Sequence, residues 1–406
     1  MMKRFDLWIV VLFFALATGC DINNSNIQPE ASFVRVYEST NPDEAYYPQD
    51  IISLSEGNYL IVSSLEDSVH SPQMNYPPVC LIGIDAAGEV ISTEILPVNY
   101  SNPVPGAFLM GGAAYFVCMD DITNQAILME VEISGGEIIF REAGELQNDF
   151  PLYVWSDGSN ILLLSYNSWG QSILTKYRSD LTVQWESSLD IDEGLRGKTM
   201  EHLRLEDRAP FFISEIKAQQ ENGKYLVNCF DGSSLALKYF DMENGSFEVA
   251  GIYSYQAETG ITAALHHRDN LFSLARFHSG NSYVYPLATI ETGSLMNTAE
   301  LDDIIIPQLK PETPTDILLY KHHDINYIVF GSTTRSNQIL LLFYNEETGI
   351  REYTHTLGFG NPVEITKMIT SEEGSLVILG ETMLNEKYQR INLYKIDPEQ
   401  LLFDTE

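Results

Sequence analysis

Two histidine pairs are the residues whose types and spacing most readily suggest chemistry in this sequence. His266-His267 and His322-His323 lie 56 residues apart. Imidazole nitrogens bind transition metals, so rings brought together from both pairs would form a metal site. Neighbouring residues of a strand point to opposite faces, however, so only one ring of each pair would be available to a shared site. A repeating fold also explains the spacing without a ligand, and we therefore predict no metal site.

The acidic residues show no recognisable catalytic or calcium-binding arrangement. Asp120-Asp121 and Asp231-Gly232-Ser233 lack the alternating oxygen ligands of a calcium loop. The chain holds 57 Asp and Glu residues, so no pair stands out as the two carboxylates of a glycosidase. The sequence also has no Gly-rich phosphate loop, nucleophile elbow or HExxH motif. We predict no cofactor, and we favour a non-enzymatic role over catalysis.

Any site must be positioned by a repeated unit of short strands. Two kinds of polar turn recur along the chain, and Gly or Asn in many of them supplies the positive φ of tight hairpins. The first kind gives a period of about 53 residues and the second about 52, which is in the range of propeller repeats. The first series ends at Gly57, Gly112, Gly158, Gly223, Asn270, Asn326 and Gly374, and the second at Gly88, Gly136, Asp180, Gly245, Gly293, Gly349 and Glu399.

The repeat predicts an all-β, seven-bladed β-propeller of four-stranded blades, with a six- or eight-bladed ring as the alternative. The clearest unit has strands at Ile365–Ile369, Leu376–Gly380 and Ile391–Ile396. It lacks a fourth strand, and the alternating stretch Ser32–Glu38 lacks a unit, so we expect this stretch to close the ring as the outermost strand of the last blade. Glu193–Asp207 is predicted to be an inserted loop that contains at most a helical turn.

Binding residues are expected on the face where the connections between the second and third strands meet the blade-to-blade links. Loops on a rigid scaffold vary freely and usually carry binding sites. Aromatic and polar side chains there would stack on sugar rings or grip a peptide, although aromatic residues in loops also simply pack those loops down. Our candidates for ligand contact are Tyr100, Tyr166, Trp169, Arg276, His278 and Arg335.

The charge of the chain limits its partners. Lys and Arg total 23 against 57 Asp and Glu, which gives a formal net charge of −34. Such a charge repels nucleic acid and anionic lipid surfaces, so we predict no nucleic-acid partner. Cys80, Cys118 and Cys229 each lie in an apolar, strand-like run, and we interpret them as buried thiols.

The N-terminus resembles the signal sequence of bacterial lipoproteins. Lys3 and Arg4 precede an apolar stretch, Leu7–Ala17, that is too short to span a membrane comfortably. Leu16–Cys20 resembles a lipobox, which implies cleavage before Cys20 and lipidation of its thiol. The alternative is a plain secretory signal. We expect a signal peptide at 1–19, a flexible tether at 20–31 and a single propeller domain at 32–406.

The repeats resemble the "DGGYLILGST … LIKTD" units of β-propeller lipoproteins in Bacteroidota-type bacteria. The similarity lies in Glu56–Val62, Glu373–Glu381, Leu174–Tyr177 and Leu393–Asp397. It implies a chain anchored in the outer membrane through Cys20, facing the periplasm or the cell surface. Three functions stay open: binding of an extracellular ligand (a glycan first) or partner protein, a lyase or glycosidase acting on polysaccharide, and docking within an envelope complex.

Overall fold

The structure is a computed structural model that describes residues 32–401, apart from 39–40, 42, 67–73, 217–222, 254–258, 292, 299–300, 302–303, 312, 359 and 385–387. The expected signal peptide, the Cys20 lipidation site and the tether therefore lie outside the described residues. Among the described residues, no helix combines the length and the hydrophobicity needed to cross a membrane.

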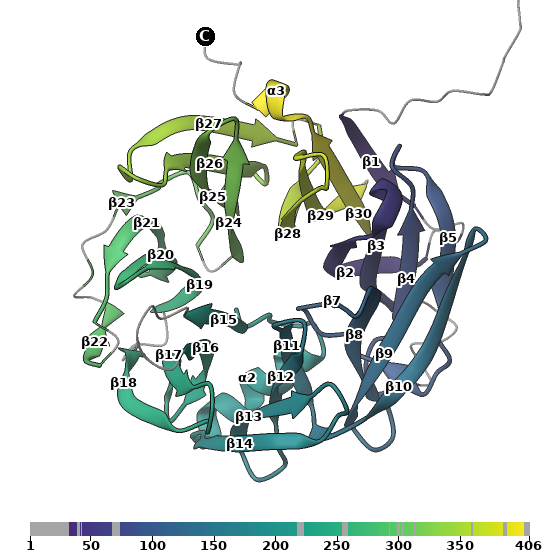
Figure 1. Cartoon of the computed structure of the whole chain (residues 1–406). Helices are drawn as coiled ribbons and strands as arrows, with labels where there is room; N and C mark the ends of the chain where they lie inside the picture. The colour runs from purple at the N-terminus through teal and green to yellow at the C-terminus, as the bar shows by residue number, and fades with distance from the viewer. Residues whose placement is uncertain are drawn as a thin grey trace, which may run out of the picture. The chain divides into compact units, whose positions relative to one another are not determined.

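Seven antiparallel sheets follow one another around a ring, which confirms the predicted seven-bladed β-propeller (Figure 1). Each sheet is built from hairpins in chain order, as the two series of turns predict. The first blade contains β2 (Ala45–Ser53), β3 (Tyr59–Glu66), β4 (Val79–Ile84) and β5 (Val90–Ile95), with a 3-10 turn at Ser55–Gly57. The second contains β6 (Tyr100–Ser101), β7 (Phe108–Met110), β8 (Ala113–Asp120), β9 (Gln125–Ser134) and β10 (Glu137–Asp149), and both β6 and β7 pair with β8.

The remaining blades repeat this plan. The third contains β11 (Pro151–Ser156), β12 (Asn160–Tyr166), β13 (Gln171–Arg178) and β14 (Val183–Asp190). The fourth contains β15 (Phe212–Ile216), β16 (Lys224–Asp231), β17 (Ser234–Asp241) and β18 (Phe247–Tyr253), to which β22 (Leu295–Asn297) adds in parallel. The fifth contains β19 (Thr259–Arg268), β20 (Leu271–His278), β21 (Asn281–Thr289) and β23 (Ile304–Ile305). The sixth contains β24 (Thr315–His322), β25 (Ile325–Thr333), β26 (Ile339–Asn345) and β27 (Arg351–Leu357).

The last blade joins the two ends of the described chain. Its strands β28 (Val363–Thr370), β29 (Leu376–Leu384) and β30 (Tyr388–Ile396) are completed by β1 (Phe33–Tyr37), which pairs antiparallel with β30. The backbone N–H of Asp397 also donates to Ser32 Oγ at 2.8 Å. This confirms the predicted closing strand, which removes the two exposed sheet edges that an open ring would have.

The hydrophobic core is divided among the contacts between neighbouring blades. The described residues form seven apolar clusters. Six of them draw on two adjacent sheets, and the one between the third and fourth blades also includes Met119 of the second blade and Tyr76 of the first. The second strand of each blade supplies much of this core because both of its faces are covered. Leu60, Ile61 and Val62, for example, are fully buried. Cys80, Cys118 and Cys229 are free, buried thiols within these clusters or strands, as expected.

Two faces of the ring can be named from the topology. The loop face carries the connections from second to third strands and from blade to blade, and the hairpin face carries the turns from first to second and from third to fourth strands. The link at 191–211 joins blades three and four on the loop face and contains α2 (Glu193–Leu203). We expected at most a helical turn there. The longer helix forms because Thr199 and Leu203 are buried against the blades while its other side is exposed.

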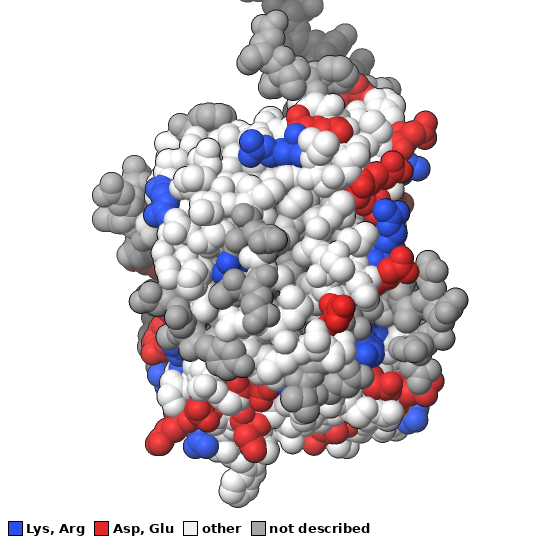
Figure 2. Space-filling view, turned by 90° about the vertical axis from the view of Figure 1, so that its left-hand side faces the viewer, with Lys and Arg blue, Asp and Glu red and all other residues white. Residues whose placement is uncertain are grey.

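The surface shows no strong separation of charge on the side that can be inspected. In Figure 2, acidic and basic side chains are interspersed, and neither sign gathers into a single patch. On this side of the molecule, the acidic residues therefore form a solvated surface rather than a dedicated cation-binding face.

Candidate functional site

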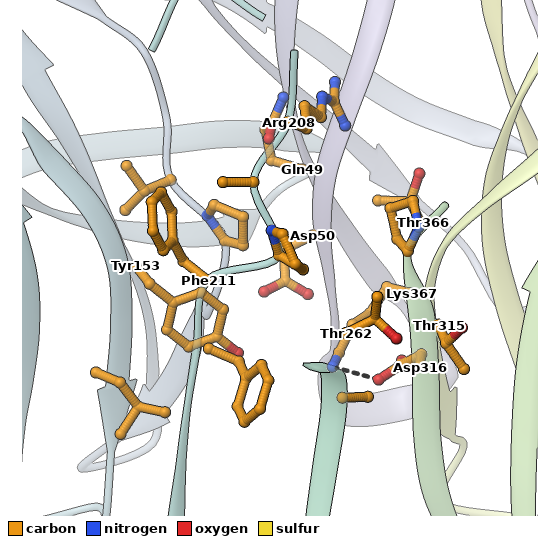
Figure 3. Close-up of a pocket in the computed structure, with 18 of the residues that line it drawn as sticks. Gln49, Asp50, Tyr153, Arg208, Phe211, Thr262, Thr315, Asp316, Thr366 and Lys367 are labelled. Atoms are coloured by element: carbon orange, nitrogen blue, oxygen red, sulfur yellow. Dashed lines mark hydrogen bonds and ion pairs between the residues drawn. The ribbon is translucent and has the colours of Figure 1, made fainter. Parts of the chain in front are cut away.

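A cavity of about 340 Å³ lies in the channel at the centre of the ring. Its volume is at the lower end of the range for small-molecule sites. The innermost strands of six blades line it, together with the segment between β6 and β7 and the link at 191–211. The polar and charged lining residues include Gln49, Asp50, Tyr153, His202, Arg208, Thr262, Thr315, Asp316, Thr366 and Lys367, and ten of the lining residues are labelled in Figure 3.

Asp50 is a buried carboxylate held by backbone N–H groups. It lies in β2 next to a register shift in the pairing with β3, and only 3 % of it is exposed. Its Oδ2 accepts the N–H of Gly106 at 2.6 Å and that of Ala107 at 2.8 Å, and Oδ1 accepts its neighbour's N–H at 2.8 Å. Burial raises the pKa of the Asp50 carboxyl, while Lys367 and the three N–H donors act in the opposite direction. The carboxylate thereby ties the first blade to the second.

Lys367 in β28 and Asp316 in β24 form an ion pair in the wall of the cavity, and the blade that carries Lys367 is the neighbour of the one that carries Asp50. The Lys367 Nζ lies 3.3 Å from Asp316 Oδ1, and Asp316 Oδ2 accepts the backbone N–H of Met368 at 2.7 Å (Figure 3). The negative charge of Asp316 raises the pKa of Lys367 despite an opposing effect of burial, and Tyr153 and Asp50 add to the rise. Lys367 is therefore a permanent cation. Its ammonium carries three N–H donors, and one donor suffices for Asp316.

Aromatic side chains provide the apolar part of the lining. Tyr153 and Trp155 come from β11, and Phe211 and Phe212 come from the end of the link and the start of β15. The Tyr153 hydroxyl points into the same space as the Asp50 carboxylate and the Lys367 ammonium (Figure 3). Burial raises the pKa of Tyr153 to about 12, so its hydroxyl stays protonated and can donate a hydrogen bond.

The link at 191–211 borders the cavity on the loop face. The backbone N–H of Ala209 donates to His202 Nδ1 at 3.0 Å, and Asn228 Nδ2 donates to the Pro210 carbonyl at 2.6 Å. Arg208 Nη1 donates to the Pro48 carbonyl at 3.4 Å, so the link reaches across to the first blade. Arg208 Nη2 is buried and has no hydrogen-bond partner within the described part of the chain. Burial lowers the pKa of His202 to about 3, and the positive charge of Arg208 acts in the same direction.

This arrangement favours binding over acid–base catalysis. Both carboxylates already accept backbone N–H bonds, and Asp316 is also paired with Lys367, so neither is free to carry a proton to a substrate. The charges of the cavity balance, with Asp50 and Asp316 against Lys367 and Arg208. A neutral polar ligand therefore fits better than an ion.

The residues predicted for ligand contact lie elsewhere, around the loop face. None of the six, all of which are described, lines the channel cavity. Trp169 is 81 % exposed in the turn between β12 and β13, where its N–H donates to Asn167 Oδ1 at 3.1 Å. Tyr166 is only 6 % exposed and packs against Phe150. Tyr100 donates to Glu142 Oε2 at 3.2 Å.

The other three predicted residues have contacts within the protein. Arg276 is 5 % exposed and lies over the Tyr283 ring, 4.4 Å from its centroid. The ring of His278 is 3.3 Å from Ser279 Oγ. Arg335 donates to the Gly280 carbonyl at 2.6 Å and so joins the sixth blade to the fifth. Of these six side chains, that of Trp169 is the least restrained by contacts with the rest of the protein. The role of the six residues in ligand binding stays a prediction.

The acidic pairs and the first histidine pair have structural partners. Asp121 accepts the N–H groups of Asn75 and Tyr76, and Asp231 forms an ion pair with Lys238 at 2.9 Å. His267 Nε2 is 2.5 Å from Ser273 Oγ, and its Nδ1 is 3.6 Å from Glu346 Oε1 in the next blade.

Sequence reasoning missed the channel residues because it searched the loops. A signal was present: Asp50, Asp316 and Lys367 are charged residues inside first strands, and an apolar residue follows each of them. In a propeller the first strand borders the channel, so a charge in its middle has to face inward or pair with a neighbour.

The fold and the channel define this chain as a β-propeller. No family model matches the sequence, and no curated protein does either. The β-propeller domain of the Trilobed protease from Pyrococcus furiosus is 12 % identical, with a TM-score of 0.44 over 89 % of this chain and 99 % of that one. Saccharomyces cerevisiae Sqt1 is 9 % identical, with a TM-score of 0.46 over 91 % and 100 %. Trypanosoma rangeli sialidase in complex with sialic acid is 9 % identical, with a TM-score of 0.42 over 91 % and 60 %. At such identities the likeness concerns the fold alone.

Proposed function

We propose that this chain is a lipid-anchored binding protein of the bacterial cell envelope that takes a neutral polar ligand, a sugar unit of a glycan first, in its channel cavity. One observation carries the proposal: buried polar groups of balanced charge converge with aromatic side chains on one small cavity. Aromatic faces suit the C–H faces of a sugar ring, and fixed donors and acceptors suit its hydroxyls.

The unpaired donors of the cavity support a ligand with acceptor oxygens. Arg208 Nη2 is buried without a partner among the described residues, and a buried donor left in this state costs about 1–3 kcal/mol. Arg208 lines the cavity, so a shift of its side chain toward a ligand hydroxyl would relieve this cost. The Tyr153 hydroxyl and the remaining donors of Lys367 face the space around the Asp50 carboxylate, whereas Arg208 lies beside Gln49 at another part of the lining (Figure 3).

The test is a glycan-array screen of the full-length protein in detergent micelles, followed by titration of the hits. Tyr153→Phe and Arg208→Lys each remove a donor while keeping the ring or the charge, so we expect each to weaken binding about threefold to tenfold. Tyr115→Phe is the matched control because its hydroxyl bonds Glu130 away from the channel. An array without hits would refute the proposal.

The same titration decides between the channel and the loop face. Trp169→Ala removes the exposed indole on the loop face and should leave channel binding unchanged. If Trp169→Ala abolishes binding while Tyr153→Phe and Arg208→Lys do not, the ligand site belongs to the loop face and the channel assignment is wrong.

The anchor is proposed from the N-terminal sequence and is tested separately. Radiolabelled palmitate should be incorporated into the wild-type chain in bacteria, and Cys20→Ala should abolish both the label and the membrane association. A labelled Cys20→Ala protein would contradict lipidation at this residue.

A further inference from the structure

A cluster of three metal-ligating side chains lies on the hairpin face, away from the channel cavity. It consists of His322 at the end of β24, His323 in the following turn, and Glu399 in α3 (Pro398–Leu401). One ligand atom from each residue lies within 4.8 Å of the other two. We propose that these three side chains bind a divalent transition-metal ion of the Zn²⁺ type.

The backbone explains how two neighbouring histidines come together. The sequence led us to expect opposite directions for the two rings, as in a regular strand. His323, however, has φ +51°, in the left-handed region, because it lies in the turn between β24 and β25. The two ring centroids are therefore 4.1 Å apart, with the ring planes at 76°. The turn, rather than the strand, sets the direction of the second ring.

The distances are close to those that a bound ion requires. Zinc lies about 2.0–2.1 Å from imidazole nitrogens and carboxylate oxygens, which places tetrahedral ligand atoms about 3.4 Å apart. His323 Nε2 is 3.8 Å from Glu399 Oε1. These two side chains are 69 % and 63 % exposed, so both can move to close the site, while His322 is 8 % exposed and fixed. Three protein ligands leave one position for water.

The neighbouring blade provides an internal comparison. One blade earlier, His267 approaches Glu346 at 3.6 Å, so a contact between a histidine and a carboxylate of the next blade occurs twice. In that pair, however, His266 Nε2 is 2.9 Å from the Asp269 carbonyl, and His267 Nε2 is engaged by Ser273. In the described part of the chain, no protein hydrogen bond occupies the ring nitrogens of His322. The second position thus keeps its imidazoles available, and the first does not.

A bound ion would connect the hairpin of the sixth blade to the segment that follows the last strand. Asp397 Oδ1 accepts the N–H of Glu399 at 2.9 Å and holds the start of this segment. The metal would therefore act as a clamp beside the ring closure. By mass action, an ion that binds the folded chain alone raises its unfolding temperature.

The experiment uses the full-length protein without a histidine tag. Isothermal titration with ZnCl2 should give one equivalent per chain, and Co²⁺ should give the visible absorption of a tetrahedral site. His323→Gln and Glu399→Gln should each weaken binding at least about tenfold and remove the thermal shift caused by Zn²⁺. His266→Gln, near the end of β19 in the fifth blade, should bind as wild type does.

Two results would overturn the proposal. One is a stoichiometry well below one in the wild-type protein, and the other is unchanged Zn²⁺ affinity in both His323→Gln and Glu399→Gln. Both substituted residues are exposed, so circular dichroism should confirm that these variants are folded.

Discussion

Acidification should destabilise the protein through His202, which holds the link over the channel. The imidazole accepts the N–H of Ala209 through Nδ1 and packs edge-on against Phe211, with ring centroids 4.8 Å apart. The hydrogen bond requires the neutral ring, because a protonated Nδ1 cannot accept a hydrogen bond. Burial lowers the pKa of His202 from 6.5 to about 3 in the folded chain.

The sign and size of the effect follow from this difference. The unfolded chain takes up a proton at His202 as the pH falls below 6.5, while the folded chain does not, so stability is lost between pH 6.5 and the folded pKa. Each pH unit in this window is worth 1.36 kcal/mol, so His202 should remove about 2 kcal/mol of stability between pH 7.5 and pH 5. This figure is an upper limit, because His202 borders the cavity and solvent there reduces the effect of burial on its pKa.

The measurement is the free energy of unfolding in urea at pH 7.5 and pH 5.0, followed by tryptophan fluorescence. His202→Asn keeps an acceptor near the Nδ1 position but cannot be protonated in this range. The loss of stability between the two pH values should be smaller in the variant by about 2 kcal/mol. His267, whose pKa is also lowered by burial, is present in both proteins and cancels. An equal loss in wild type and variant would refute the reasoning.

Three further predictions concern the ring itself, each measured as a change in the free energy of unfolding. Phe33→Ala in the closing strand should lower the free energy of unfolding by about 3 kcal/mol, because Phe33 is only 5 % exposed. Val34 is 56 % exposed, so Val34→Ala should stay within about 0.5 kcal/mol of wild type. Equal costs for the two substitutions would argue against closure by this strand. Asp50→Ala should cost about 3 kcal/mol because two N–H groups of the second blade lose their acceptor; a neutral result would mean that water replaces the carboxylate. Gly106→Ala should lower the free energy of unfolding by more than about 3 kcal/mol, because Gly106 has φ +102° and a Cβ there would lie 1.6 Å from the Val154 carbonyl oxygen. A variant as stable as wild type would show that this segment can shift.

The sequence was sufficient to predict the architecture because short local patterns identify the repeat. Glycine and asparagine turns occur at a fixed spacing, and the apolar second strands lie between them. Each unit of this kind buries its faces only against its neighbours, so the ring follows from the number of units. The strand Phe33–Tyr37, which belongs to no unit of its own, could then be assigned to the incomplete last blade, where it pairs with β30.

The channel site could not be predicted because it depends on how the blades are aligned around the axis. Asp50, Tyr153 and Lys367 come from three different blades, and no local pattern states that they face one another. The convergence of His322 and His323 was missed for a different reason. The left-handed φ of a single turn residue reversed the alternation that a regular strand would impose.

The pairing of β1 with β30 has a consequence for the synthesis of this protein. Ser32 and Asp397, which are joined by a hydrogen bond, are 365 residues apart in the chain. Contacts of such long range form slowly, and this one has to wait until the ribosome has released nearly the entire polypeptide. Earlier blades can fold one after another, but until then the final sheet stays incomplete and exposes an unpaired strand edge that favours aggregation. Premature termination before β30 would therefore yield a product inclined to aggregate rather than a smaller functional ring.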